Sequence, residues 1–292
     1  MRKSGFIGTL LLLGAVAFAA ALLFAACGDD EEGGEPAATA TEGADETPAG
    51  IDISGVPELE DGKLTVGSDI TYAPMEFYEE GTETAMGLDV DLGAAIGEVL
   101  GVDVEFSNTG WDGLIPALNT EDFDVIMSSM TITDERLQEI DFVPYVNVGT
   151  GILVPAGNPD GIQGIEDLCG LTVAVQVGTI QADMATAQSD QCDEPIDVVT
   201  FDTNPLAVED LRTEGADANM ADFPVAFLDA QKSDGDLEVI EVQLDPAPYG
   251  IGVRKASTAL KAVLEQAVDA IIASGRYDEI LAEWDLASTA LQ

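Results

Sequence analysis

The chain has 292 residues, of which 46% are hydrophobic, and this suits one large or two medium folded domains rather than a disordered polymer. Ten Lys and Arg against 56 Asp and Glu give a net charge of −46, which argues against nucleic acid and anionic membrane surfaces as partners. The absence of His excludes catalytic systems and metal sites that depend on histidine. An enzymatic interpretation must therefore rest on carboxylates, Tyr, Lys or hydroxyl groups.

The first 26 residues have the pattern of an export signal, because Arg2 and Lys3 precede an uncharged apolar run over 5–26. Small residues end this run before Cys27, a pattern that resembles the cleavage box of bacterial lipoproteins. We therefore expect a signal peptide at 1–26, removed by cleavage, and a lipid on Cys27. The alternative is an uncleaved membrane anchor, because an apolar run of this length can span a bilayer.

Residues 27–62 form a predicted linker. The segment contains no basic residue and no hydrophobic periodicity, and it is rich in Gly, Ala, Thr, Pro and acids. This composition is typical of a solvated tether. We expect it to connect the lipid on Cys27 to a folded body that begins near Lys63.

Strand and helix patterns alternate from Lys63 onward. Short apolar runs predict strands at 64–68, 102–106 and 125–127, and helical spacing predicts helices that end near residue 100 and at 112–119. Such alternation favours a mostly parallel sheet covered by helices. Because ligands bind at the carboxyl ends of strands in such sheets, we expect a site around Asp69, Trp111 and the segment 128–136, each of which follows a strand.

The segment 128–136 has the composition of an anion-binding site. Four Ser and Thr residues precede Arg136, whose planar guanidinium can bind a carboxylate through two parallel hydrogen bonds. A small carboxylate is the ligand that this order of residues favours. The alternative is that the hydroxyl groups cap a short helix and that Arg136 pairs with Glu135 or Glu139 on the surface.

A second α/β series follows a long apolar run over 148–155. Strands are predicted at 171–177, 198–201, 218–221 and 237–242, with helices beginning near Thr179, Asn204 and Asp222. The chain then returns through 248–253 to a helix with an apolar stripe from Leu260 to Ile272 and to a short closing helix. The pattern predicts two similar halves.

Cys169 and Cys192 are the cysteines that remain once Cys27 is assigned to the lipid anchor. They lie 23 positions apart (192 − 169) and flank one strand–helix unit of the second half. Because exported proteins meet an oxidising environment, we predict a disulfide between them. The alternative is two buried free thiols.

Four blocks of sequence resemble family 3 of the extracytoplasmic solute-binding proteins, the polar amino-acid receptors of ABC importers. They lie at 64–74, at 87–92 (Gly-Leu-Asp-Val-Asp-Leu), at 111–118, and at 128–136 (Ser-Ser-Met-Thr-Ile-Thr-Asp-Glu-Arg) continuing to 145. Weaker similarity continues at 167–179 and 218–222. The resemblance covers residues 63 to about 287.

The resemblance implies an α/β, bilobal periplasmic-binding-protein-like fold of type II, with two α/β lobes joined by two crossing strands. It places lobe 1 at 63–150 and 250–292 and lobe 2 at 155–246. It also implies an extracytoplasmic, lipid-anchored monomer that delivers an amino acid to the transmembrane subunits of an ABC importer, without a cofactor.

The same resemblance assigns contacts to the two charged ends of an amino acid. Arg136 would bind the α-carboxylate with help from Ser129 and Thr131, and Asp222 would bind the α-ammonium. The alternative for Asp222 is an N-cap of the helix that follows it, a role that is compatible with ligand binding.

The remaining positions would surround the ligand's side chain. Tyr72 and Trp111 would form aromatic walls, although both are also suited to core packing. Further contacts from the second lobe would come from Thr179, Ile180 and Gln181. Asp69 would face the ligand's side chain.

Asp69 leads to a prediction of specificity. Arg136 and Asp222 balance the ligand's two charged ends, which leaves the Asp69 carboxylate to be offset by the ligand. We therefore expect a cationic or amide side chain, with arginine, lysine, ornithine and glutamine as candidates. The alternative is that Asp69 pairs with a protein group, such as Lys63 or a backbone turn, and never meets the ligand.

Two features of the sequence allow other interpretations. Asp89 and Asp91 have the look of a metal pair, but acids are favoured in the first turn of a helix, so we expect no metal there. The main functional rivals are a dehydratase-like enzyme on the same fold, with a pocket carboxylate as general acid, and a ligand-sensing module for a signalling partner.

Overall fold

The computed structural model describes residues 50–240 and 243–291. In its first half the strands and helices are β1 (Lys63–Ser68), β2 (Thr71–Tyr72), β3 (Glu76–Tyr78), β4 (Ala85–Met86), α1 (Leu88–Leu100), β5 (Asp103–Asn108), α2 (Leu114–Asn119), β6 (Val125–Ile126), α3 (Arg136–Glu139) and β7 (Ile140–Pro155). The chain continues through β8 (Thr172–Gln176), α4 (Ile180–Ser189), β9 (Asp197–Phe201), α5 (Asn204–Arg212), β10 (Ala218–Asp222), α6 (Phe223–Lys232), β11 (Leu237–Val239), β12 (Leu244–Arg254), α7 (Thr258–Ser274) and α8 (Arg276–Glu283). The predicted signal peptide, Cys27 and the linker up to residue 49 lie outside the described residues.

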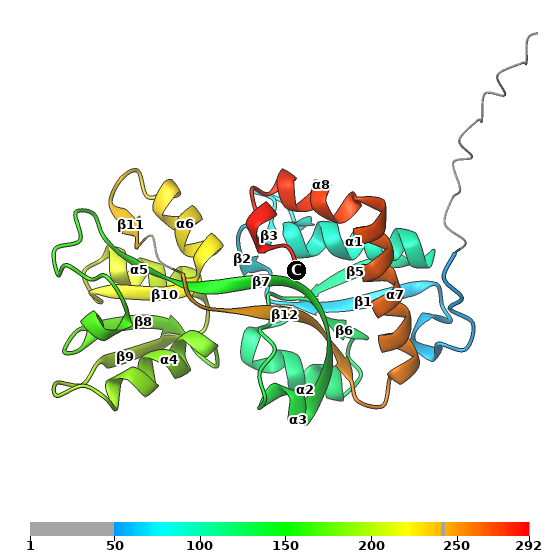
Figure 1. Cartoon of the computed structure of the whole chain (residues 1–292), viewed down its shortest axis with the longest axis horizontal. Coiled ribbons are helices and arrows are strands. Elements are labelled where there is room, and N and C mark those ends of the chain that lie inside the picture. The colour runs from blue at the N-terminus through cyan, green and yellow to red at the C-terminus, as the bar shows by residue number, and fades with distance from the viewer. Residues whose placement is uncertain (1–49, 241–242, 292) are drawn as a thin grey trace, which may run out of the picture. The chain divides into compact units, whose positions relative to one another are not determined.

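The two halves of the chain form two α/β lobes with the same strand order (Figure 1). In one lobe β5, β1 and β6 are parallel and β12 pairs antiparallel with β6. In the other lobe β9, β8 and β10 are parallel and β7 pairs antiparallel with β10. The predicted bilobal type II fold is thus confirmed, whereas each lobe's sheet is mixed because its fourth strand crosses over from the other half of the chain.

Two long strands join the lobes. β7 and β12 pair antiparallel over most of their length, from Arg254 opposite Ile140 to Leu244 opposite Thr150, with register shifts on the way. One continuous sheet therefore runs through both lobes, with β12 beside β6 and β7 beside β10 (Figure 1). Because β7 and β12 run through both lobes, they give no sharp boundary between them. The lobe limits, 63–150 and 250–292 for lobe 1 and 155–246 for lobe 2, therefore stay a prediction.

Helices cover both faces of each lobe's sheet. In the first lobe the buried apolar residues of α1, α7 and α8 share one core with β1 and β12, and α2 packs with Ile126 of β6 in a separate core on the opposite face. In the second lobe Ala185 of α4 packs with β8 and β10, and Leu211 of α5 packs with Leu153 of β7. Burial of these stripes fixes each helix on its sheet.

Local sequence signals account for several element boundaries. α1 ends at Gly101, which adopts φ 73° and thus the left-handed conformation that favours glycine after a helix. The apolar stripe of α7 is buried as expected except for Ile272, which is exposed. The helix predicted at 112–119 begins instead with a 3-10 turn, Trp111–Gly113, before α2.

The end of the predicted linker belongs to the folded body. Val56 and Leu59 are buried in the core of the first lobe, and Arg254 of β12 forms an ion pair with Glu58 at 3.3 Å. Residues 56–59 therefore anchor the beginning of the body rather than continuing the tether. Within residues 50–240 and 243–291, no helix has the length and apolar character needed to cross a membrane.

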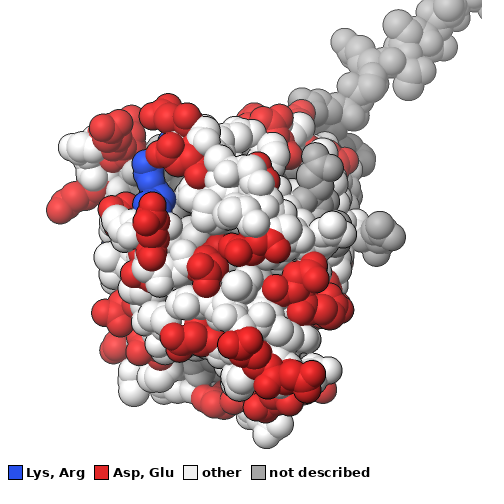
Figure 2. Space-filling model, turned by 90° about the vertical axis from the view of Figure 1, so that its left-hand side faces the viewer, with Lys and Arg blue, Asp and Glu red and all other residues white. Residues whose placement is uncertain are grey.

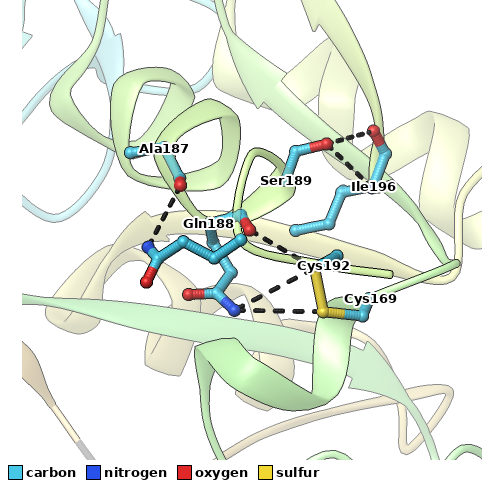
Figure 3. Close-up of a disulfide and its surroundings, with 7 residues drawn as sticks. Cys169, Ala187, Gln188, Ser189, Cys192 and Ile196 are labelled. Atoms are coloured by element: carbon cyan, nitrogen blue, oxygen red, sulfur yellow. Dashed lines mark hydrogen bonds between the residues drawn. A yellow bond between two sulfur atoms is a disulfide. The ribbon is translucent and has the colours of Figure 1, made fainter. Parts of the chain in front are cut away.

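The predicted disulfide is confirmed. Cys169 and Cys192 are bonded, with their Cα atoms 5.5 Å apart, and the Gln188 amide lies beside both sulfur atoms (Figure 3). The bond ties the segment before β8 to the segment after α4. It closes a loop around one strand–helix unit, a constraint of the kind that contributes about 3 kcal/mol in the chain-entropy model.

Candidate ligand-binding site

Strand ends from both lobes meet around one cavity. Asp69 follows β1 and Ser129 follows β6 in the first lobe, and Gln176 ends β8 and Asp222 ends β10 in the second. The carboxyl ends of parallel strands are the usual place for ligands in such sheets. The cavity therefore lies where the sequence places the site.

All ten residues assigned to ligand binding line this cavity: Asp69, Tyr72, Trp111, Ser129, Thr131, Arg136, Thr179, Ile180, Gln181 and Asp222. Glu76 and Gln176, which the sequence analysis missed, complete the lining. Gln176 is a polar residue at the carboxyl end of a buried strand. The expectation that ligands bind at such strand ends, which pointed to Asp69, therefore applies to Gln176 as well. Glu76 lies on the short strand β3, outside the main sheet, and no sequence pattern marks it.

Arg136 is held by backbone carbonyl groups. Its Nη1 donates to the carbonyl of Thr131 at 2.7 Å and its Nη2 to the carbonyl of Gly178 at 3.3 Å. The guanidinium also lies over the Trp111 ring, 5.2 Å from its centroid. Among the described residues Arg136 forms no ion pair with Glu135 or Glu139, so the surface-pairing alternative is not observed.

Asp222 is buried, with 6% of its surface exposed, and is held by polar groups of both lobes. The Tyr72 hydroxyl donates to Oδ2 at 2.9 Å, and the Gln181 amide donates to Oδ1 at 2.9 Å. The side chain does not cap α6. Burial raises the pKa of Asp222 to about 6, against the lowering effect of its hydrogen bonds.

Asp69 is 4% exposed and also accepts from both lobes. Gln176 of the second lobe donates to Oδ2 at 2.7 Å, and the Thr71 hydroxyl donates to Oδ1 at 2.9 Å. Lys63 pairs with Glu105 instead, so the predicted alternative of an Asp69–Lys63 pair is not observed. Burial raises the pKa of Asp69, and the two hydrogen bonds oppose this effect.

Glu76 and Asp89 form a buried carboxyl pair beneath the cavity. Glu76 is 1% exposed and Asp89 is completely buried. The Ser128 hydroxyl donates to Glu76 Oε1 at 2.8 Å, while Asp89 Oδ2 accepts from the Ser129 N–H and the Tyr145 hydroxyl, both at 2.8 Å. Burial raises the pKa of Asp89 to about 7 and the pKa of Glu76 well above its ordinary value, the latter with a further rise from the neighbouring Asp89 charge.

Asp89 and Asp91, considered above as a metal pair, have separate structural partners. Asp89 belongs to the pair with Glu76, and Asp91 accepts a hydrogen bond from Trp284 Nε1 at 2.8 Å. The described part of the chain contains no cluster of three or more Cys, Asp or Glu suited to a metal ion.

Direct contacts between the lobes close the cavity. Trp111 Nε1 donates to the carbonyl of Gly178 at 2.9 Å, and the Asp222 N–H donates to the Tyr72 hydroxyl at 2.9 Å. Together with the Gln176–Asp69 contact, these bonds connect residues that would line a ligand from opposite sides. The structure is therefore in a closed arrangement of the lobes.

Comparison with known proteins identifies the family. The model of the bacterial extracellular solute-binding proteins, family 3, matches residues 64–287, and the chain belongs to this family. A probable histidine-binding protein of Neisseria gonorrhoeae is 31% identical over 235 residues, which cover 79% of this chain and 86% of the relative. The predicted membership of this receptor family is thus confirmed.

Solved structures show the same similarity. A mutant of ArgBP from T. maritima is 36% identical, with a TM-score of 0.72 and coverage of 79% of this chain and 98% of that protein. An ancestral arginine-binding protein has been solved bound to arginine and bound to glutamine. Both structures are 34% identical with a TM-score of 0.72, covering 76% and 77% of this chain and 98% of theirs. The named relatives are binding proteins, so the protein is a solute receptor and not a dehydratase-like enzyme.

The buried carboxyl groups give the ligand-free protein a predictable pH dependence. Asp89 and Asp222 have folded pKa values of about 7 and about 6, above their ordinary value of 3.8. Between pH about 4 and 7 the folded state therefore binds more protons than the unfolded chain. Its free energy of unfolding should fall as the pH rises through this range, by at most about 1.4 kcal/mol per pH unit for each proton.

Urea denaturation at pH steps from 5 to 8 measures this slope. Glu76→Gln should flatten it, because an amide that donates to Asp89 favours the ionised carboxylate and so lowers the folded pKa of Asp89. Glu98→Gln, on the exposed side of α1, is the matched control and should keep the wild-type slope. An unchanged slope in Glu76→Gln would contradict the assignment.

Proposed function

We propose that this protein binds a free amino acid with a cationic side chain, arginine fitting best, and delivers it to the transmembrane subunits of an ABC importer. The observation that carries the proposal is the charge of the cavity lining, which contains three carboxyl groups, Asp69, Glu76 and Asp222, and one cation, Arg136. A zwitterionic ligand adds one charge of each sign and leaves this excess of acids in place.

Two of these residues are suited to the charged ends of the amino acid. The Arg136 guanidinium is fixed by two carbonyl groups, and its planar form suits a carboxylate. Asp222 is fixed by Tyr72 and Gln181 and suits the α-ammonium. Thr131, Thr179 and Ile180 lie around the same cavity, whereas Ser129 donates its N–H to Asp89 and its hydroxyl to Glu76 Oε2 at 3.1 Å. A ligand carboxylate would therefore have to displace the hydroxyl contact to use Ser129.

The other end of the cavity suits a cationic side chain. Asp69 carries a buried carboxylate whose protein partners, Thr71 and Gln176, are neutral. A buried carboxylate without a cation is costly, so a guanidinium or ammonium group is favoured there. The faces of Tyr72 and Trp111 can add about 0.5–2 kcal/mol by cation–π contact.

The relatives support a cationic ligand and leave an amide as the second candidate. Two of the solved proteins described above are arginine-binding, and one of them has also been solved with glutamine. Glutamine can donate to Asp69 but leaves its charge in place. Among the candidates, arginine, lysine and ornithine are therefore favoured over glutamine.

The acidic surface favours the approach of a cation. Figure 2 shows acidic side chains over much of one face and basic side chains in one small area. Between residues 155 and 246 the basic residues are Arg212 and Lys232 alone. A field of one sign raises the local concentration of ligands of the opposite sign, to an extent that falls with ionic strength.

We also propose that the signal at 1–26 is removed and that a lipid on Cys27 holds the monomeric receptor at the outer face of the membrane. The small residues before Cys27 and the acidic linker support this placement. Metabolic labelling with a fatty-acid analogue should mark the wild-type protein, and labelling of Cys27→Ala to the same extent would reject the anchor.

The role of Asp69 predicts a change in ligand ranking. Asp69→Asn keeps the size of the side chain but removes its charge. The affinity for arginine should therefore fall at least tenfold, while the affinity for glutamine should change less than threefold. Titration calorimetry with arginine, lysine, glutamine, glutamate and leucine measures the ranking. The proposal fails if glutamate or leucine binds most tightly to the wild type, or if the ranking is unchanged in the variant.

The role of Arg136 predicts a loss of binding affinity that is common to all amino-acid ligands. Arg136→Ala should weaken every amino acid by about 2–5 kcal/mol, the range for truncating one partner of a buried charge pair. Arg212→Ala is the control, because Arg212 is exposed and pairs with Asp236 at 3.7 Å. A loss of less than threefold in Arg136→Ala, measured by the same calorimetry, would remove Arg136 from the carboxylate site.

A further inference from the structure

We infer that Glu76 adapts the site to the charge of the ligand: it holds a proton against Asp89 when the ligand's side chain is neutral and releases that proton when the side chain is cationic. This inference rests on the proposed function, since it concerns the same cavity. It assigns to Glu76 a direct role in specificity and to Asp89 a positioning role behind it.

The hydrogen bonds around the pair leave a place for one proton. Asp89 Oδ2 receives two donors, the Ser129 N–H and the Tyr145 hydroxyl, as expected for an ionised carboxylate. Asp89 Oδ1 is buried and has no hydrogen-bond partner among the described residues, whereas Glu76 accepts the Ser128 hydroxyl at Oε1 (2.8 Å) and the Ser129 hydroxyl at Oε2 (3.1 Å). A proton on the neighbouring Glu76 carboxyl supplies that missing donor, and such a hydrogen bond is among the interactions that lower the pKa of Asp89.

Within residues 50–240 and 243–291, no positively charged side chain is bonded to the pair. The ion pairs among the described residues involve neither Glu76 nor Asp89. Two buried carboxyl groups that share a site do not both ionise easily, because their like charges repel. The pair therefore holds one proton until a cation arrives, and Glu76 is the member that lines the cavity.

The titratable groups that face the pair come from several elements. Asp69 follows β1, Asp222 ends β10 and Tyr145 lies on β7, and each of them acts on Glu76 or Asp89 through its charge or a hydrogen bond. Tyr72 on β2 is affected by the charge of Glu76, and Arg136 of α3 lines the same cavity.

The exchange of the Glu76 proton for a cationic ligand side chain is an acid dissociation. When a guanidinium or ammonium group enters, the O–H bond of Glu76 breaks, the electron pair stays on the carboxylate, and the proton passes to the solvent. The ligand's charge replaces the proton's charge. A ligand with a neutral amide side chain leaves the O–H bond of Glu76 intact. The same cavity can therefore accept cationic and amide side chains, and in neither case is a carboxylate of the pair left buried without compensation.

Arginine and citrulline provide a matched pair of probes, because citrulline replaces the guanidinium with a neutral group of nearly the same shape. Both ligands carry the same α-ammonium and α-carboxylate, so any proton released from Asp222 is common to both. The difference between them therefore reports on the side-chain end of the cavity alone.

The experiment is titration calorimetry of the full receptor at pH 5 to 8, in pairs of buffers with different ionisation enthalpies. Near pH 6 arginine should release up to one proton more than citrulline, and its affinity should rise by up to tenfold per pH unit relative to citrulline. In Glu76→Gln this difference should vanish, whereas Glu98→Gln should keep it.

The outcomes separate this inference from the proposed function. Equal proton release by arginine and citrulline, or an undiminished difference in Glu76→Gln, overturns the exchange while arginine binding still stands; the latter result would identify another acid such as Asp69 as the source. Failure of both ligands to bind contradicts the proposed function and the exchange together. In the ligand-free protein, a protonated-carboxyl infrared band that is lost in Glu76→Gln supports the shared proton independently, and an unchanged band overturns it.

Discussion

The antiparallel pair of β7 and β12 is the constraint on which the site depends. β12 pairs with β6 in one lobe and β7 pairs with β10 in the other, so the carboxyl ends of β1 and β6 and those of β8 and β10 border the same cavity. Hydrogen bonds such as that from Gln176 to Asp69 then form between residues more than a hundred positions apart in the chain. The two strands β7 and β12 thus suffice to bring residues of both lobes together in one site.

Within this frame, charge decides what the cavity accepts. Asp69, Glu76 and Asp222 line it and Asp89 lies behind Glu76, whereas Arg136 is the cation of the lining. Neutral donors hold these carboxyl groups in position without cancelling their negative charge. That charge is compensated by the ligand and by a shared proton. The same imbalance that organises binding also makes the ligand-free protein sensitive to pH, since burial raises the pKa of Asp89 and Asp222.

The sequence predicted most of this arrangement, for physical reasons that also explain what it missed. Apolar patterns located the strands, and Asp69, which directly follows one of them, lines the cavity as the placement of ligands at strand ends predicts, whereas Asp222 was assigned through the family resemblance. The strand patterns predicted a mostly parallel sheet, as the parallel strands of each lobe confirm, whereas the two crossing strands, β7 and β12, followed from the family resemblance and not from those patterns. Glu76 was missed because it lies on a short strand outside the main sheet, and its burial beside Asp89 arises only from tertiary packing.

The most direct measurement of the central claim is native mass spectrometry of the purified receptor after incubation with an equimolar mixture of the protein amino acids and ornithine. The account predicts that one unmodified cationic amino acid is retained, with arginine in excess over lysine, ornithine and glutamine. Retention of glutamate or leucine in preference to these, or recovery of a chemically altered ligand, would contradict it.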